Sequence, residues 1–225
     1  MVYKFLIIEF FLNSNMNMRN DLDSLFQLTP DYVKKACKVA GEAFQDDPIM
    51  LFVYPDEKER KQKSKYGFYM LYNYGIKYGL AFATSNNLEG ITIWLPPNKV
   101  YPSTWSMMRH GGFYTMCKVG LKLKAMKRTM TVFKYEEERH RELAPFDHWY
   151  FQNIAVKPEE QGKGYGGLLI STMLKTIERD GLPIYVETNT EKSVCIYQKY
   201  GFEILEHGMI PETDVPLWCM LRKPK

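Results

Sequence analysis

A strand that leads through a glycine-rich turn into a helix limits the fold of this chain more than any other stretch. Residues 148–166 read HWYFQNIAVKPEEQGKGYG. The first part alternates aromatic, β-branched and polar residues, as a strand does, and Pro158 prevents the strand from continuing. Glycines follow, and apolar residues then recur at helical spacing from Leu168 to Ile177. The pattern predicts a strand, a tight turn and a helix that stops at Gly181.

The turn lies at the N-terminus of the predicted helix, where backbone N–H groups lack intrahelical partners and the helix dipole is positive. Glycines let a ligand approach the backbone closely, and Lys163 adds a positive charge, so a diphosphate fits the turn. The spacing excludes a P-loop, because neither Lys-Ser nor Lys-Thr follows the last glycine. It also differs from the dinucleotide fingerprint G-x-G-x-x-G. An ordinary glycine-rich turn is the alternative interpretation.

Composition indicates one globular domain in a reducing compartment. The chain has 225 residues, 45% of them hydrophobic, which is enough for one large core. The formal net charge of +4 is too mild to require a nucleic-acid partner. Four cysteines lie far apart without a C-x-x-C pair, so neither a zinc site nor a disulfide framework is indicated. We therefore expect a cytoplasmic protein without a metal.

The opening residues MVYKFLIIEFFLNSNMNMRN contain an apolar run that resembles a signal peptide. We reject that interpretation because Glu9 interrupts the run, only Lys4 precedes it, and no small-x-small cleavage site follows. The run is also far short of the ~20 residues that a membrane span needs. Two readings stay open: an extra element packed on the domain, or an extension before a start at Met16 or Met18. We therefore separate an extension, residues 1–20, from a single domain, residues 21–225.

The remaining chain predicts helices alternating with strands in the coarse order β-α-α-β-β-α-α-β-α-β-α-β-β, a mixed α+β sheet domain. The hairpin is expected to turn at Asn86-Asn87, because asparagine tolerates the positive φ of such turns. The stretch KVGLKLKAMKR could form a basic surface, but apolar residues at helical spacing more often mark a core stripe. The expected elements before residue 148 are a strand at 26–28, a helix at 29–44, an apolar segment at 49–54, a charged helix at 55–78, a hairpin at 80–95 and helices at 101–143 with a break at Gly111-Gly112.

A second strand, residues 184–188, follows the central helix. A strand–helix–strand unit closes as a right-handed parallel crossover, so this strand should lie beside the first one. Ligands in such sheets bind beyond the carboxyl ends of the strands, which places Glu187, Thr188 and Asn189 near the glycine-rich turn.

Two motifs give the chain its resemblance to a known family. Residues 161–166 read Q-x-x-G-x-G, similar to the pyrophosphate loop [RQ]-x-x-G-x-[GA] of the GNAT superfamily of acetyl-CoA-dependent N-acyltransferases. Family members commonly end with N-x-x-A-x-x-x-Y-x-x-x-G-F, and Tyr197, Gly201 and Phe202 occupy the last positions of that frame. Thr190 stands where the frame has Asn and Ser193 where it has Ala, which puts the usual contacts of that Asn in doubt.

The resemblance is strongest from residue 148 to residue 222, and the H-W-Y before the loop points to a subgroup of the family. It implies a mixed, mostly antiparallel central sheet with one splayed parallel strand pair, flanked by helices. It also implies that acetyl-CoA binds with its pyrophosphate on the loop and its pantetheine arm along residues 153–156. The cofactor-binding residues expected on this basis are Ile154, Ala155, Val156, Gln161, Gly162, Lys163, Gly164, Tyr165, Gly166, Asn189 and Ser193.

Acyl transfer to an amine needs an acid for the leaving thiolate and a base for the amine proton. Tyr197 is the candidate acid, because it matches the family tyrosine. Glu187, at a strand end that faces the cleft, is the candidate base, and His148 is the alternative. Trp149 and Tyr150, together with His148, are candidates for the acceptor pocket, although core packing would explain them equally well.

The leading hypothesis is therefore an N-acetyltransferase that acts on a primary amine. Two alternatives remain: a regulatory module that binds acetyl-CoA without turnover, and an acyltransferase for a bulkier acyl group. The expected partners are acetyl-CoA and an amine acceptor, without nucleic acid or membrane, and a homodimer is left open.

Overall fold

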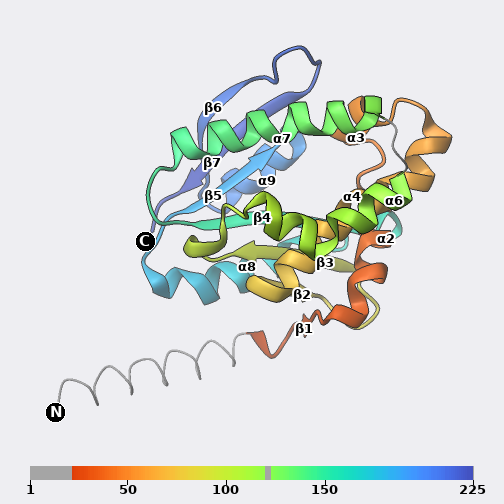
Figure 1. Ribbon diagram of the computed structural model, residues 1–225. Helices are drawn as coiled ribbons and strands as arrows, with labels where there is room; N and C mark the ends of the chain where they lie inside the picture. Colours follow the sequence, from red (N-terminus) through yellow and green to blue (C-terminus); the bar gives the residue numbers. More distant parts are fainter. Residues whose placement is uncertain (1–21, 120–122, 225) are drawn as a thin grey trace.

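A seven-stranded sheet with helices on both faces organises the computed structural model, which describes residues 22–119 and 123–224 (Figure 1). The strand order is β1-β2-β3-β4-β5-β7-β6. Neighbouring strands are antiparallel except β4 and β5, which are parallel. This confirms the predicted mixed, mostly antiparallel sheet. The strands are β1 Phe26–Gln27, β2 Leu80–Ala83, β3 Gly90–Leu95, β4 Trp149–Val156, β5 Ile184–Thr188, β6 Glu203–Met209 and β7 Pro216–Arg222.

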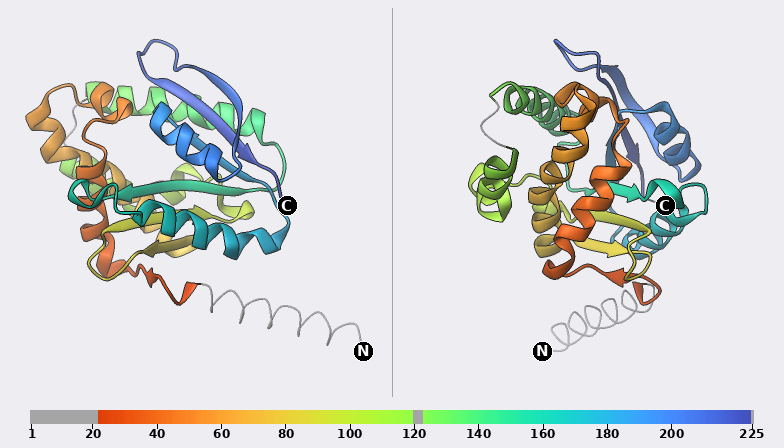
Figure 2. Two further views of the ribbon diagram at one scale, coloured as in Figure 1. Left: turned by 180° about the vertical axis from the view of Figure 1, so that it is seen from behind. Right: turned by 90° about the vertical axis from the view of Figure 1, so that its right-hand side faces the viewer.

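The helices form two layers, one on each face of the sheet (Figure 2). Helices α8 and α9 bury apolar side chains against one face, whereas α2 and α4 cover β2 and β3 on the other and α7 covers β5 and β7 there. The described helices are α2 Val33–Ala43, α3 Pro48–Val53, α4 Glu57–Tyr78, α5 Thr104–Met107, α6 Phe113–Val119, α7 Leu123–Leu143, α8 Tyr165–Ile177 and α9 Glu191–Lys199.

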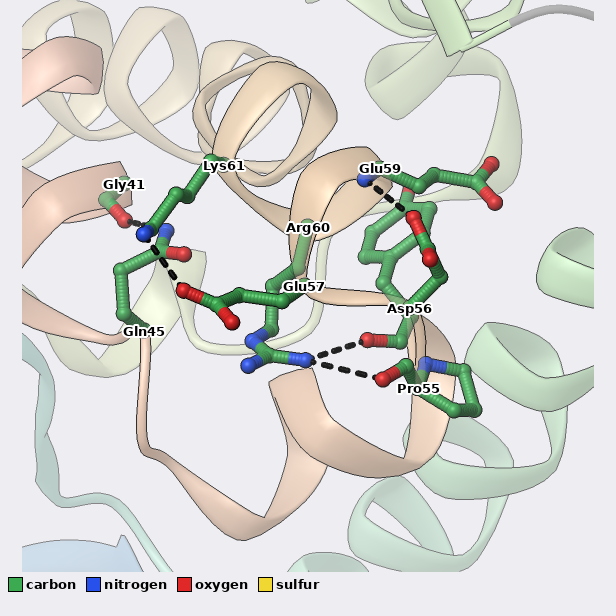
Figure 3. Close-up of polar contacts among 9 residues, drawn as sticks. Gly41, Gln45, Pro55, Asp56, Glu57, Glu59, Arg60 and Lys61 are labelled. Atoms are coloured by element: carbon green, nitrogen blue, oxygen red, sulfur yellow. Dashed lines mark hydrogen bonds and ion pairs between the residues drawn. The ribbon is translucent and has the colours of Figure 1, made fainter.

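The corner between α3 and α4 is held by hydrogen bonds to helix ends (Figure 3). The Asp56 carboxylate accepts from the Glu59 amide at 2.7 Å and caps α4. The Arg60 guanidinium donates to the backbone carbonyls of Tyr54 (2.9 Å) and Pro55 (3.3 Å). These bonds satisfy backbone groups that a helix end leaves unpaired. The apolar segment expected at 49–54 thus becomes the short helix α3.

The β2–β3 hairpin forms as predicted, but its turn differs from the expected one. The positive φ falls on Leu88 (58°) and not on either asparagine. The Leu88 side chain is fully buried, and its amide donates to the Ser85 carbonyl at 3.1 Å. Burial of a leucine contributes about 2 kcal/mol, which offsets the cost of a left-handed residue. The core therefore selects the turn position over the local preference of asparagine.

The long helical region before β4 breaks where the sequence predicted. Gly111 has a φ of 122° inside the wide turn Met108–Gly112, which a residue with a side chain would adopt only with strain. On α7, Ala125 is buried but Met126 is 41% exposed, so the predicted core stripe is only partly formed there. The extension at residues 1–20 lies outside the described residues. Within the described ranges, each helix is too short or too polar to span a bilayer.

Candidate active site

The glycine loop, residues 161–166, connects the end of β4 to the start of α8 as predicted. Gly162 and Gly164 have φ angles of 81° and 89°, in the left-handed region, and Gly164 is the N-cap of α8. A Cβ built on either glycine meets no atom within 4 Å, so the space in front of the loop is open. The first amides of α8 have no intrahelical acceptor. The loop therefore offers backbone donors to an anion that can approach closely, and it fits a pyrophosphate.

The polar side chains of the loop, those of Gln161 and Lys163, lie in solvent. Lys163 is exposed and its ammonium group lies 2.9 Å from the Glu160 carboxylate, which raises the pKa of Lys163. The Gln161 amide donates to the Val156 carbonyl at 3.3 Å. An exposed ion pair of this kind contributes little stability. Lys163 can therefore turn from Glu160 to a bound phosphate at small cost.

Strands β4 and β5 pair only at their first residues. Trp149 lies opposite Ile184 and Tyr150 opposite Tyr185, and the register of the described strands goes no further. Strand β4 continues beside β3, with a register shift at Gln152. The second half of β4, which includes Ile154, Ala155 and Val156, thus pairs with β3 while its β5 side is splayed. An extended ligand could add to that edge by backbone hydrogen bonds.

A half-buried carboxylate, that of Glu187, lies at the end of the splayed pair. The hydroxyl groups of Tyr185 and Tyr150 each donate to Glu187 at 3.0 Å, one to each carboxylate oxygen. Burial raises the pKa of Glu187 to about 7, and the two hydroxyl donors act in the opposite direction. A carboxylate with a pKa near neutrality can both take and release a proton at physiological pH.

Two further carboxyl groups complete what we call the carboxyl cluster: Asp47, Glu136 and Glu187. Burial raises the pKa of Glu136 well above its usual value, repulsion from Glu187 and Asp47 raises it further, and a hydrogen bond with Asn189 opposes the rise. Burial also raises the pKa of Asp47, to about 6, against donation from the amides of the first turn of α3. Like charges that lie close together and are half-buried cannot all ionise. The cluster therefore favours a cationic ligand, whose charge would let the carboxyl groups ionise.

Sequence reasoning missed Asp47 and Glu136. Asp47 precedes Pro48, a position typical of a helix cap, and it does cap α3 by accepting from the Ile49 amide at 2.9 Å. Glu136 belongs to an acidic run that is typical of a solvated helix face. One signal was available: Glu136 is four residues from both Val132 and His140, which are buried, so the three share a helix face.

Tyr197 lies on the opposite face of the sheet from Glu187. Its ring centroid is 5.4 Å from Phe151 of β4 and 5.9 Å from Phe202, in the core beneath α8 and α9. Burial raises the pKa of Tyr197, so the phenol stays protonated at neutral pH. Side chains alternate along a strand, so Glu187 shares the face of Tyr185, which packs toward α7. The two residues can act on one ligand only where β4 and β5 diverge.

Two other residues expected to bind the cofactor, Asn189 and Ser193, lie at the start of α9. The Thr190 hydroxyl accepts from the Ser193 amide at 3.3 Å and donates to the Ser193 hydroxyl at 2.9 Å. Threonine thus supplies the N-cap at the position where the family frame has Asn. Asn189 donates to the Pro216 carbonyl at 2.8 Å and so links the end of β5 to the start of β7.

The three residues expected in the acceptor pocket separate in the structure. Tyr150 contacts Glu187, as described above. The Trp149 indole donates to Asp180 at 2.8 Å and packs in the core with α8, on the other face. His148 is 1% exposed and both of its ring nitrogens have partners within the protein. The structure thus brings Tyr150 alone of the three to the carboxyl cluster.

A separate hollow of about 430 Å³ lies between α2 and α4 and reaches Pro158 at the end of β4. Three lysines, Lys38, Lys61 and Lys65, line it. Figure 3 shows three of the lining residues: Gly41, Gln45 and Lys61. Glu42 also lines the hollow and pairs with Lys38, and Lys61 pairs with Glu57, so part of the lysine charge is compensated. Within the described residues, no group of three His, Cys, Asp or Glu side chains is arranged to hold a metal ion.

The sheet order, the splayed parallel pair and the glycine loop together define a GNAT-type fold. Residues 129–204 match the family model of the acetyltransferase (GNAT) domain. This segment contains β4, the loop, α8, β5 and α9.

Known proteins are similar to this chain over most of its length. A protein of Schizosaccharomyces pombe named as an uncharacterized N-acetyltransferase is 29% identical over 208 residues, which cover 87% of this chain and 81% of the relative. One solved structure, from Corynebacterium glutamicum, is described as histone acetyltransferase HPA2 and related acetyltransferase. It superposes with a TM-score of 0.59 at 20% identity, over 90% of this chain and 96% of that one. Arylalkylamine N-acetyltransferase 2 from Aedes aegypti gives 0.56 at 11% identity, over 89% and 98%. These structures share the fold with this chain.

Proposed function

We propose that this chain is a GNAT N-acetyltransferase that transfers the acetyl group of acetyl-CoA to a primary amine by direct attack on the thioester. The single observation that carries the proposal is the position of Glu187. A carboxylate with a pKa of about 7 lies at the open end of the β4–β5 pair, and the chain leaves β4 through the glycine loop. One ligand that spans the splay would meet a phosphate site and a proton acceptor.

The cofactor would be held by the loop and by the free edge of β4. Amides from Gly162 to Gly166, with Lys163, would bind the pyrophosphate, and the pantetheine arm would add along Ile154 to Val156 as an extra strand. A β4 amide would then point at the thioester carbonyl and stabilise the developing oxyanion. Gln161, Tyr165, Asn189 and Ser193 complete the proposed cofactor contacts.

In the proposed reaction, the amine nitrogen attacks the carbonyl carbon and the carbon–sulfur bond breaks. Glu187 takes one proton from the ammonium form of the acceptor, directly or through water, so that the neutral amine can attack. The nitrogen releases its second proton to solvent as the amide forms, and Tyr197 gives its hydroxyl proton to the departing thiolate. The pKa values support these roles, because Glu187 titrates near neutrality and Tyr197 remains protonated. The carboxyl cluster supports an acceptor that arrives as a cation.

The proposal treats residues 21–225 as one acyltransferase domain of the subgroup with H-W-Y before the loop. The cysteines in the described residues are free thiols, which supports a reducing, cytoplasmic setting. Tyr150 is the residue of the H-W-Y motif that we place beside the acceptor, because its hydroxyl donates to Glu187.

Two measurements test the proposal. Acetyl-CoA at ~100 times its dissociation constant should stabilise the fold by about 2.7 kcal/mol, seen as a rise in melting temperature. Free thiol should be released from acetyl-CoA when a panel of primary amines is added. A melting shift without thiol release from any amine would favour a regulatory module, and faster release from longer acyl-CoA esters would favour a bulkier donor. The proposal fails if millimolar acetyl-CoA moves neither quantity while a known CoA-binding protein responds.

A further inference from the structure

Two buried histidines contact each other directly behind the carboxyl cluster. His140 of α7 and His148, which precedes β4, are 4% and 1% exposed, and their Nε2 atoms lie 2.7 Å apart. His148 Nδ1 lies 2.6 Å from the Phe146 carbonyl oxygen. A carbonyl can only accept, so His148 carries its proton on Nδ1. Burial lowers the pKa of both imidazoles, that of His140 to about 3, so both rings are neutral.

These contacts determine which nitrogen holds each proton. Neutral His148, protonated on Nδ1, has a lone pair on Nε2. The proton between the two rings therefore belongs to His140 Nε2, which donates to His148. We call this arrangement the histidine pair. It holds only while His148 is neutral, because a second proton on His148 would set two N–H groups against each other at 2.7 Å.

The His140 ring also contacts both phenols that donate to Glu187. It stacks on Tyr185 with ring centroids 4.1 Å apart and an interplanar angle of 10°. It lies 4.6 Å from the Tyr150 ring at an angle of 52°. The two tyrosines that donate to the carboxylate oxygens of Glu187 thus both contact the His140 ring.

We propose that the histidine pair is a positioning device for Glu187, in which the bond to His148 sets the His140 ring and that ring aligns the Tyr185 and Tyr150 hydroxyl groups with the carboxylate. This inference rests on the proposed function only in taking Glu187 as the base. The pair connects the end of α7 and the start of β4 to β5, so a change at His148 should reach Glu187 without any direct contact.

Other charged and titratable groups face the pair. Tyr101 lies 4.9 Å from His140 and 6.4 Å from His148 between ring centroids. Arg141 lowers the pKa of His140, whereas Asp147 acts in the opposite direction on His148. These groups will contribute to any pH response, so the test follows the titration of Glu187 itself.

Two substitutions at one position separate the bond from the packing. His148→Asn places an amide near the former Nδ1, so it can still donate to Phe146, but it is too short to reach His140. His148→Gln places its terminal amide near the former Nε2 and can accept from His140. Loss of an aligned donor destabilises the charged carboxylate, so His148→Asn should raise the pKa of Glu187 by about 0.5 to 1 unit. His148→Gln should restore the value of the unsubstituted protein.

The measurement is an NMR titration of ¹³C-labelled glutamate side-chain carboxyl carbons, with Glu187→Gln used to assign the Glu187 signal. The acid limb of kcat/KM against pH should move upward by the same amount. His110→Phe is the control, since His110 also lies against two tyrosines, Tyr74 and Tyr78, and bonds a backbone carbonyl at 2.6 Å. It should leave the Glu187 titration unchanged.

The inference is overturned if His148→Asn lowers the melting temperature but leaves the Glu187 titration where it was, because the pair would then only pack the core. The inference is also overturned if His148→Gln and His148→Asn shift the pKa of Glu187 equally, because the hydrogen bond to His140 would then make no difference. Should the protein acetylate no amine at all, the proposed function fails, yet the NMR titration still decides whether the pair positions Glu187.

Discussion

The glycine loop and the carboxyl cluster both lie at the parallel strands β4 and β5, but they form in different ways. The loop consists of consecutive residues, its first four positions are exposed, and its binding groups are backbone amides at a helix end. The cluster draws carboxyl groups from the α2–α3 connection, α7 and β5, and burial perturbs the pKa of each one. The loop's chemistry therefore comes from backbone conformation, and the cluster's chemistry comes from exclusion of water.

This difference predicts different responses to substitution. A change in the loop should alter ligand binding while the rest of the fold stays as it is, because the first four loop positions are exposed. A change in the cluster or the buried phenols should alter proton chemistry, and its effect should depend on pH.

The largest effect should follow Tyr197→Phe, which removes one hydroxyl from the buried side of the site. If Tyr197 protonates the leaving thiolate, kcat should fall by roughly 10²- to 10⁴-fold, while the affinity for acetyl-CoA at the loop is nearly unchanged. Steady-state kinetics with calorimetric binding of acetyl-CoA would measure both. Tyr74→Phe is the matched control, because it removes from α4 a hydroxyl that donates to the Lys99 carbonyl. A loss of less than about threefold would rule out an essential acid.

Glu187→Gln should change how stability depends on pH. Burial raises the pKa of Glu187 from 4.5 to about 7, so between these values the folded protein binds a proton that the unfolded chain has lost. Stability should therefore fall as pH rises from about 5 to 7, and this group accounts for at most about 3 kcal/mol of the fall. The glutamine variant should lose that part of the slope in urea denaturation.

Glu89→Gln is the control for this slope, because the pKa of Glu89 is lowered to about 2. The contribution of Glu89 is present above the unfolded pKa and is lost only as pH falls, so removing it should leave the slope between pH 5 and 7 intact. An unchanged slope in Glu187→Gln would mean that the carboxylate is better solvated than its burial indicates.

Gly164→Val should have the smallest effect on the unliganded protein, and its effect should be confined to the loop. Valine at a φ of 89° costs about 1–2 kcal/mol of stability. Its side chain would also occupy the open space in front of the amides, so the ~2.7 kcal/mol of stabilisation by acetyl-CoA should disappear from thermal denaturation. Gly181→Val places the same residue at a φ of 64° beyond the far end of α8. This variant should lose the same stability through its backbone conformation but should still be stabilised by acetyl-CoA. If both variants lost the stabilisation by acetyl-CoA, the cause would be strain in α8 and not a blocked loop.

The sequence predicted most of the elements but misplaced details that depend on packing. The strand, turn and helix around the loop, the parallel β5 and the break at Gly111 were all expected. The positive φ of the hairpin was assigned to asparagine and occurs at Leu88, because a buried side chain outweighs a local backbone preference. The sequence predicted His148 as a site residue, whereas its contact with His140 arises only in the fold.

The sequence by itself determined the glycine loop and the cap of α9, since both depend on residues within one turn of chain: left-handed φ angles that glycine alone adopts freely, and a threonine that bonds the amide three residues on. The tertiary structure alone decided the carboxyl cluster and the histidine pair. Glu136 and Glu187 lie 51 positions apart in the sequence, and Asp47 lies a further 89 positions before Glu136. Their pKa values depend on how much water the packed helices and strands exclude around them, which no local pattern of residues specifies.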